Sequence, residues 1–285
     1  MGESRRVAAD TRTYTASLPV VIEATKAAGF DALDMGIEDI EPFPGGLKAA
    51  ASVLGQSGMQ APTFRLLRDF EGSGEARPKR FEEAEALMDA MAGIGAKTLQ
   101  VCANTDPNSS GDPTEQIKDL RFLAAVAQSR NLCIGFEPLP WSRWINDYDK
   151  AWACVEAVNH PCLGLVLDTF HLFSRYTSLE VLDRITMDKL FAVQLSNAVT
   201  MPLPTIEIAR HHRLFPSEGE WPVAEVVQRI EARGYEGYYS LEVFNDKFKK
   251  QDPFELARTA MESFRRLFFV DKADLGPGKV ASFQV

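Results

Sequence analysis

The chain has 285 residues, and 45% of them are hydrophobic, which is enough to bury one large core. Its net charge is -9 and it holds no cluster of lysine and arginine, so a nucleic-acid partner is not expected. It also lacks an apolar leader and any run of about 18 apolar residues, which argues against a membrane protein and favours a cytoplasmic one. We expect a small-molecule partner and leave a homo-oligomer open.

Short apolar runs alternate with helical stretches along the whole chain. The predicted strands are residues 6–9, 32–35, 61–67, 98–102, 133–136, 164–167, 191–193 and 238–241. The predicted helices that follow them are residues 18–28, 47–58, 78–93, 114–129, 147–158, 179–187, 222–233 and 253–268. The strands read as apolar throughout, which is typical of parallel strands buried on both faces.

Eight such units predict a single α/β domain, a (β/α)₈ TIM barrel over residues 1–270. A doubly wound sheet is the less favoured fold, because it usually has fewer strands and often carries a Gly-rich phosphate loop, which is absent here. Residues 271–285 contain Gly276, Pro277 and Gly278 and are predicted to form an irregular extension.

An oxygen-bearing side chain stands at the end of each of the last four predicted strands, and the four are Glu137, Asp168, Gln194 and Glu242. The carboxyl ends of barrel strands meet at one mouth, so we expect these groups to lie together. Three carboxylates in a site of low dielectric repel one another, and a bound cation keeps them ionised. A set of oxygen ligands favours Mn²⁺ or Mg²⁺, with Co²⁺ as a further candidate, over a structural zinc.

His171 follows Asp168 by three residues and is expected in the loop beyond the sixth strand, facing the cavity. A neutral imidazole at that place suits a general base, although a lone histidine is as often structural. Arg68 stands just past the third strand and Arg213 follows the seventh. Either arginine could hold a substrate carboxylate or pair with a local acid. The four cysteines form no C-x-x-C pair and are expected to be buried and reduced.

Several segments resemble the xylose-isomerase-like superfamily of metal-dependent barrels, and within it the bacterial 3-dehydroshikimate dehydratases. They are FEPLPWSRWIND (136–147), HPCLGLVLDTFH (160–171), VQLSNA (193–198), LLRDFEG (66–72) and RHHRLFP (210–216). The resemblance implies that Glu137, Asp168, Gln194 and Glu242 hold the metal, that His171 is catalytic, and that Arg68 and Arg213 bind substrate. It also implies loss of water next to a ketone, with protocatechuate as the aromatic product.

Other functions remain open at this point. A sugar isomerase or ketose 3-epimerase of the same superfamily is the main alternative, because such enzymes share a similar metal set and the DTFH string. The two arginines and the amide of Gln194 favour the dehydratase, which acts on a carboxylated cyclic ketone. An inosose-type dehydratase is a second alternative, and a barrel without catalytic activity is a third.

Overall fold

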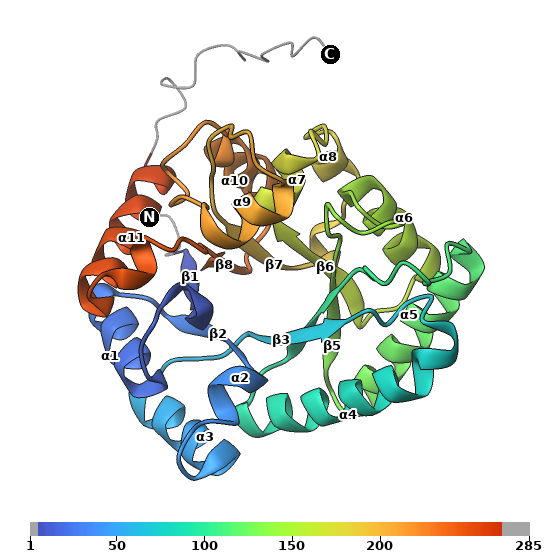
Figure 1. Ribbon diagram of the computed structural model, residues 1–285, viewed down its shortest axis with the longest axis horizontal. Helices are drawn as coiled ribbons and strands as arrows, with labels where there is room; N and C mark the ends of the chain where they lie inside the picture. The colour runs from blue at the N-terminus through green and yellow to red at the C-terminus, as the bar shows by residue number, and fades with distance from the viewer. Residues whose placement is uncertain (1–4, 270–285) are drawn as a thin grey trace.

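The computed structural model describes residues 5–269 and contains a closed ring of eight parallel strands surrounded by helices (Figure 1). The strands are β1 (Arg6–Asp10), β2 (Ala32–Gly36), β3 (Thr63–Arg68), β4 (Thr98–Cys102), β5 (Cys133–Glu137), β6 (Leu163–Asp168), β7 (Leu190–Leu195) and β8 (Tyr238–Leu241). They pair in chain order, and β8 pairs with β1. The predicted (β/α)₈ barrel is therefore confirmed. The division at residue 270 stays a prediction, because residues 271–285 lie outside the described range.

The helices that cover the ring also follow the chain order. They are α1 (Leu18–Ala28), α2 (Ile37–Ile40), α3 (Gly46–Ser57), α4 (Arg77–Ile94), α5 (Pro113–Ser129), α6 (Tyr148–Val158), α7 (Thr169–Ser174), α8 (Val181–Arg184), α9 (Thr205–His211), α10 (Val223–Glu231) and α11 (Pro253–Phe268). Their starts have local causes: the side chain of Asp112, for example, accepts a hydrogen bond from the Thr114 N–H and caps α5. Within residues 5–269, no helix combines the length and the apolar character needed to cross a membrane.

The connection between β6 and β7 differs from the prediction. Instead of one helix over residues 179–187, the chain forms α7 directly after β6, then the short α8 and a 3-10 turn at Met187–Lys189. The cause is Asp168, whose side chain accepts a hydrogen bond from the Phe170 N–H and so starts a helix at the end of the strand. Between β7 and β8 the structure adds α9, which no predicted helix covered, ahead of the predicted helix at residues 222–233.

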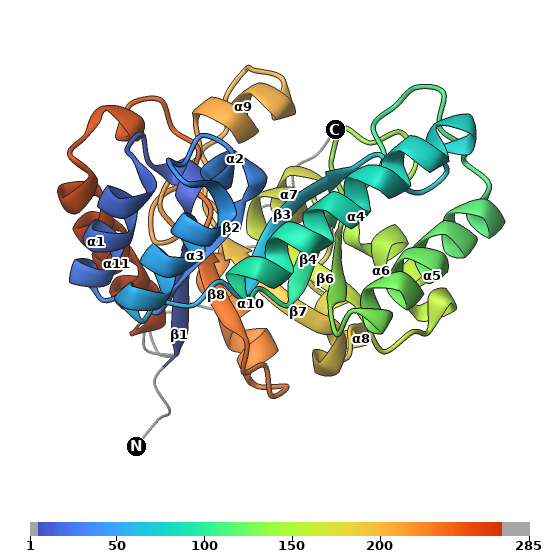
Figure 2. The ribbon, with the colours of Figure 1, turned by 90° about the horizontal axis from the view of Figure 1, so that it is seen from below.

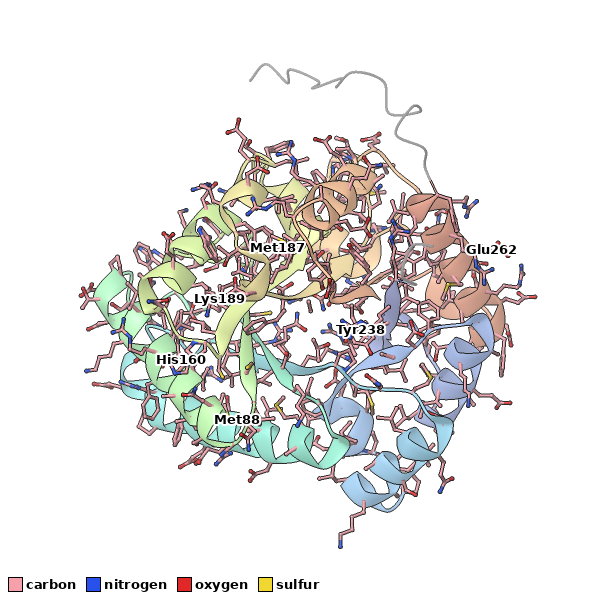
Figure 3. The ribbon with its side chains drawn as sticks, turned by 180° about the vertical axis from the view of Figure 1, so that it is seen from behind. Met88, His160, Met187, Lys189, Tyr238 and Glu262 are labelled. Carbon is pink, nitrogen blue, oxygen red and sulfur yellow. The ribbon has the colours of Figure 1, made fainter. Side chains whose placement is uncertain are left out.

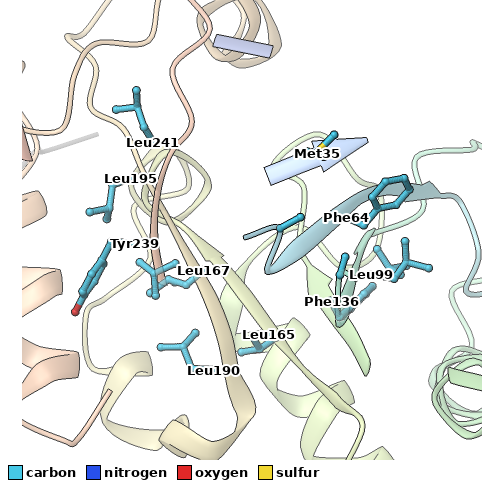
Figure 4. Packing of buried hydrophobic residues seen from close by; sticks show 14 of the residues in the cluster. Met35, Phe64, Leu99, Phe136, Leu165, Leu167, Leu190, Leu195, Tyr239 and Leu241 are labelled. Carbon is cyan, nitrogen blue, oxygen red and sulfur yellow. The ribbon is translucent and has the colours of Figure 1, made fainter. Parts of the chain in front are cut away.

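The strands have two different faces, because successive side chains of a strand point to opposite sides. The outer face is apolar and packs under the helices (Figure 4). It includes Leu99, Phe136, Leu167, Leu195 and Leu241. The inner face carries small and polar groups instead: the Thr63 hydroxyl, for instance, bonds the carboxylate of Asp34 inside the ring. The strands are thus buried on both sides, as predicted, but are not apolar throughout.

The two ends of the barrel carry different groups. The strands start at the end that Figure 3 presents, where Tyr238 opens β8 and Lys189 immediately precedes β7. They finish at the opposite end, above which α9 stands in Figure 2. The predicted site residues belong to this second end.

Candidate active site at the barrel mouth

Four neighbouring strands bring the predicted oxygen groups to one place. Glu137 is the last residue of β5, Asp168 the last of β6, Gln194 the last but one of β7, and Glu242 follows β8 directly. Strand register aligns Asp168 with Gln194. All four residues are buried, with at most 3% of their surface exposed. The structure therefore collects the groups that the sequence predicted to lie together.

A cavity of about 370 Å³ opens above these groups. Its lining is Arg12, Leu66, Arg68, Gln100, Cys102, Glu137, Leu139, Trp141, His171, Ala209, Arg210, His211, Arg213, Glu242, Phe244 and Lys249. This volume suits a small molecule of the size of a substituted six-membered ring. The apolar walls include Trp141, whose ring meets the His171 ring edge to face at 5.3 Å.

His171 lies in α7 rather than in a loop, and its ring belongs to the same cluster as the acids. Its Nε2 atom is 3.3 Å from Asp168 Oδ2 and 3.7 Å from Glu137 Oε1. Ligand atoms of these three residues all lie within 4.8 Å of one another, an arrangement that could hold a metal ion. The Nδ1 atom of His171 is buried without a hydrogen-bond partner.

Two arginines already face the carboxylates. The Arg213 Nη1 atom donates to Asp168 Oδ2 at 2.8 Å and to Glu242 Oε2 at 2.9 Å. Its guanidinium is buried between the rings of Phe170 and Phe244. Arg12 donates to the other oxygen of Glu242 at 2.7 Å. Arg213, for which the resemblance implies a role in substrate binding, thus balances the charge of two acids in this structure.

The mouth carries cations that are not paired in this way. Arg68, Arg210 and Lys249 line the cavity, and none of them makes an ion pair with another residue in the described part of the chain. Arg68 is exposed to solvent. In a chain of net charge -9, such unpaired cations around one cavity favour an anionic ligand.

Burial and mutual repulsion perturb the acids. Desolvation, reinforced by the charges of Glu242 and Asp168, raises the pKa of Glu137 to about 8. Desolvation also raises the pKa of Glu242 to about 7, although Arg213 opposes that shift. The pKa of His171 is lowered well below its ordinary value, first by burial and then by the charge of Arg213, so its ring is neutral near pH 7.

Sequence reasoning missed Arg12, Gln100 and Cys102. Gln100 and Cys102 lie on β4 and both contact Glu137. A polar residue within the apolar run of residues 98–102 was the available signal for Gln100. For Cys102 there was no such signal, since a strand cysteine usually behaves as a small apolar residue.

All four cysteines are unpaired, but only Cys102 and Cys154 are buried, so our expectation of burial was wrong for Cys133 and Cys162.

Comparisons with known proteins agree on one family. The family model of xylose isomerase-like TIM barrels matches residues 22–267. A 3-dehydroshikimate dehydratase of Pseudomonas putida is 34% identical over 263 residues, which are 92% of this chain and 41% of that protein. An inosose isomerase of Bacillus licheniformis is 26% identical over 214 residues, covering 72% of this chain and 73% of that protein.

A solved structure is similar as well. It is a xylose isomerase-like TIM barrel/4-hydroxyphenylpyruvate dioxygenase fusion protein, with a TM-score of 0.89 and 33% identity over 93% of this chain. The match covers 42% of the fusion protein. The chain therefore spans about two fifths of the length of the dehydratase and of the fusion protein.

Proposed function

Since the chain belongs to the family of xylose isomerase-like TIM barrels, we propose that it is a dehydratase that depends on a divalent cation and converts 3-dehydroshikimate into protocatechuate. The observation that carries this proposal is a cavity lined by two buried carboxylates and the neutral His171, with the buried Asp168 beside that histidine and unpaired cations at the mouth. A carboxylated cyclic ketone matches that arrangement. Its carboxylate would bind the cations at the mouth, and its ketone would lie next to the acids and the histidine.

In this proposal Glu137, Asp168, Gln194 and Glu242 hold Mn²⁺ or Mg²⁺. Three features of these residues fit a cation. Their donor atoms are oxygens, Glu137 Oε1 is buried without a hydrogen-bond partner, and two of the acids have a raised pKa that a nearby positive charge would lower. When bound, the ion supplies Lewis-acid chemistry and stabilises negative charge that develops on a carbonyl oxygen.

His171 is the proposed general base. Its ring is neutral and buried, so it can accept the acidic proton from the carbon next to the ketone without first losing one. The edge contact with Trp141 fixes the ring and keeps water from one side of it. Once the hydroxyl has left as water, enolisation of the product completes an aromatic ring, which makes the overall reaction favourable.

Arg68 and Arg213 are proposed to bind the substrate carboxylate. Arg68 is free to turn toward it, whereas Arg213 is fixed by Asp168 and Glu242 and could offer only its remaining N–H groups. Lys249 also lines the cavity and could add a third positive charge. Holding the carboxylate at the rim would present one face of the ring to His171.

An isomerase remains the alternative, supported by the similarity to an inosose isomerase over 72% of this chain. Such an enzyme, like a ketose 3-epimerase or an inosose-type dehydratase, acts on a neutral polyol ketone and has no use for unpaired cations around its cavity. Arg68, Arg210 and Lys249 therefore favour the carboxylated substrate.

The test is to incubate the purified protein with 3-dehydroshikimate and either Mn²⁺ or Mg²⁺, and to follow the ultraviolet absorption of protocatechuate. Parallel reactions contain inosose or a ketose, and a reaction with chelator is the control. We expect absorption to grow only with 3-dehydroshikimate and an ion. If neither ion gives the aromatic product and the protein turns over inosose or a ketose, the proposed dehydratase is wrong and the isomerase is correct.

A further inference from the structure

Two side chains of β4 bind the same oxygen of Glu137. Gln100 Nε2 donates to Glu137 Oε2 at 2.8 Å, and Cys102 Sγ donates to that atom at 2.9 Å. The two residues are two positions apart on the strand, so both point into the barrel. Strand register places Cys102 opposite Glu137. Both are almost completely buried, so water does not compete for these hydrogen bonds.

The consequence is that the two oxygens of Glu137 are not equivalent. Oε2 accepts two hydrogen bonds, whereas Oε1 is buried without any partner and faces His171 Nε2 at 3.7 Å. Leaving a buried carboxylate oxygen unbonded costs free energy, so a carboxylate with no constraint would turn to share its donors. The donors from β4 prevent this because both approach Oε2.

Gln100 also contacts a second proposed ligand. Its Nε2 atom lies 3.3 Å from Gln194 Oε1, and its Oε1 atom accepts from Gln194 Nε2 at 3.4 Å. The two amides therefore orient each other across the barrel. Glu242 is different, because guanidinium groups of Arg12 and Arg213 occupy both of its oxygens.

We infer that Gln100 and Cys102 are positioning residues of the cation site, which hold Glu137 with Oε1 turned toward the ion while Gln100 also fixes the Gln194 amide. This inference rests on the proposed function, since it concerns the same site. A ligand that is oriented beforehand loses less freedom when the ion binds. Removal of such a supporting group typically weakens metal binding by about 10- to 100-fold.

The test is titration of the ion-free protein with Mn²⁺, with the free ion measured by electron paramagnetic resonance. We expect Gln100→Met, which keeps the length of the side chain but loses the amide, to raise the dissociation constant by about 10- to 100-fold. Cys102→Ala should weaken binding by a smaller factor. Cys102→Ser retains a donor and should restore affinity close to that of the wild type.

Cys154→Ala is the matched control, because this buried cysteine of α6 does not line the cavity and should leave Mn²⁺ affinity unchanged. Circular dichroism with chelator present identifies any variant that does not fold. If Gln100→Met does not fold, the difference in Mn²⁺ affinity between Cys102→Ala and Cys102→Ser tests the inference by itself. Equal affinity of all folded variants and the wild type overturns the inference but leaves the cation site intact. A wild type that binds neither Mn²⁺ nor Mg²⁺ overturns the proposed site itself.

Discussion

At the scale of the residue, His171 and Glu137 are neighbours with different proposed roles. Their side chains approach within 3.7 Å, and both are buried in the same cluster. Distance alone therefore does not separate an ion ligand from a base. The two roles do differ in what a substitution should remove.

We expect His171→Ala to lower kcat by about 10²- to 10⁴-fold, the usual contribution of a general base. Its Mn²⁺ affinity should stay within a few-fold of the wild type. Glu137→Gln should instead raise the Mn²⁺ dissociation constant by at least about tenfold, because it removes one negative charge from the ligand set. Steady-state kinetics and Mn²⁺ titration measure the two effects. An active His171→Ala protein would exclude this residue from the proton transfer.

Glu71 is a buried acid outside the cavity. Its Oε1 accepts from the Asn104 N–H at 2.6 Å and its Oε2 has no partner. Desolvation raises its pKa from 4.5 to about 8. Because its pKa is higher in the folded than in the unfolded chain, the folded state binds the extra proton. The resulting stabilisation is complete below pH 4.5 and is lost as the pH rises to about 8.

Glu71→Gln should therefore flatten the pH dependence of stability between pH 5 and 8. One pH unit corresponds to at most about 1.4 kcal/mol for one such group, or ~3–6 °C in Tm for a domain of this size. Thermal melts with chelator, at several pH values, compare the variant with the wild type. Parallel Tm curves for the two proteins would contradict the assigned protonation of Glu71.

The four oxygen groups could be predicted because strand count alone places the ends of β5 to β8 at one mouth. Gln100 could not, because its role depends on the register between β4 and β5, which spacing along the chain does not reveal. The ion pair between Arg12 and Glu242 likewise joins residues 230 positions apart. Contacts between residues of different strands are thus harder to predict from the sequence than the position of a residue along its own strand.

At the scale of the element, the strands were predicted to within about two residues because each is a short apolar run between polar loops. The connection after β6 was not, because α7 begins at a side-chain cap that apolar periodicity does not show. Close contacts at the strands could not be predicted from the sequence either. Gly164, for example, leaves no room for a side chain: a Cβ atom there would lie 2.5 Å from the Lys189 carbonyl oxygen.

Gly164→Ala should destabilise the fold by about 1–3 kcal/mol, because β6 or the backbone at Lys189 must shift. Gly55→Ala is its control: Gly55 lies within α3 and a Cβ atom there meets nothing within 4 Å. That change should be neutral or stabilise by up to about 1 kcal/mol. Urea unfolding of both variants gives the comparison. Equal stability of Gly164→Ala and the wild type would show that the strand contact is not tight.

At the scale of the whole molecule, the proposed ion should stabilise the fold because it can bind only when four strands are in place. An ion at about 100 times its dissociation constant contributes about 2.7 kcal/mol. That corresponds to an increase of ~5–10 °C in Tm for a domain of this size. Thermal melts with Mn²⁺ and with chelator measure it, and Glu137→Gln should show a smaller increase. Identical Tm values for the wild type under both conditions would argue against an ion in this site.

The pairing of β8 with β1 has a consequence for biosynthesis. Glu242 stands immediately after the last strand, and its carboxylate reaches Arg12, which follows the first strand. Until β8 and Glu242 have been synthesised and β8 has paired with β1, the nascent chain holds only part of the cluster. A partial barrel therefore lacks Glu242 and its ion pair with Arg12, and the cluster is completed only when the first and last strands of the sheet join.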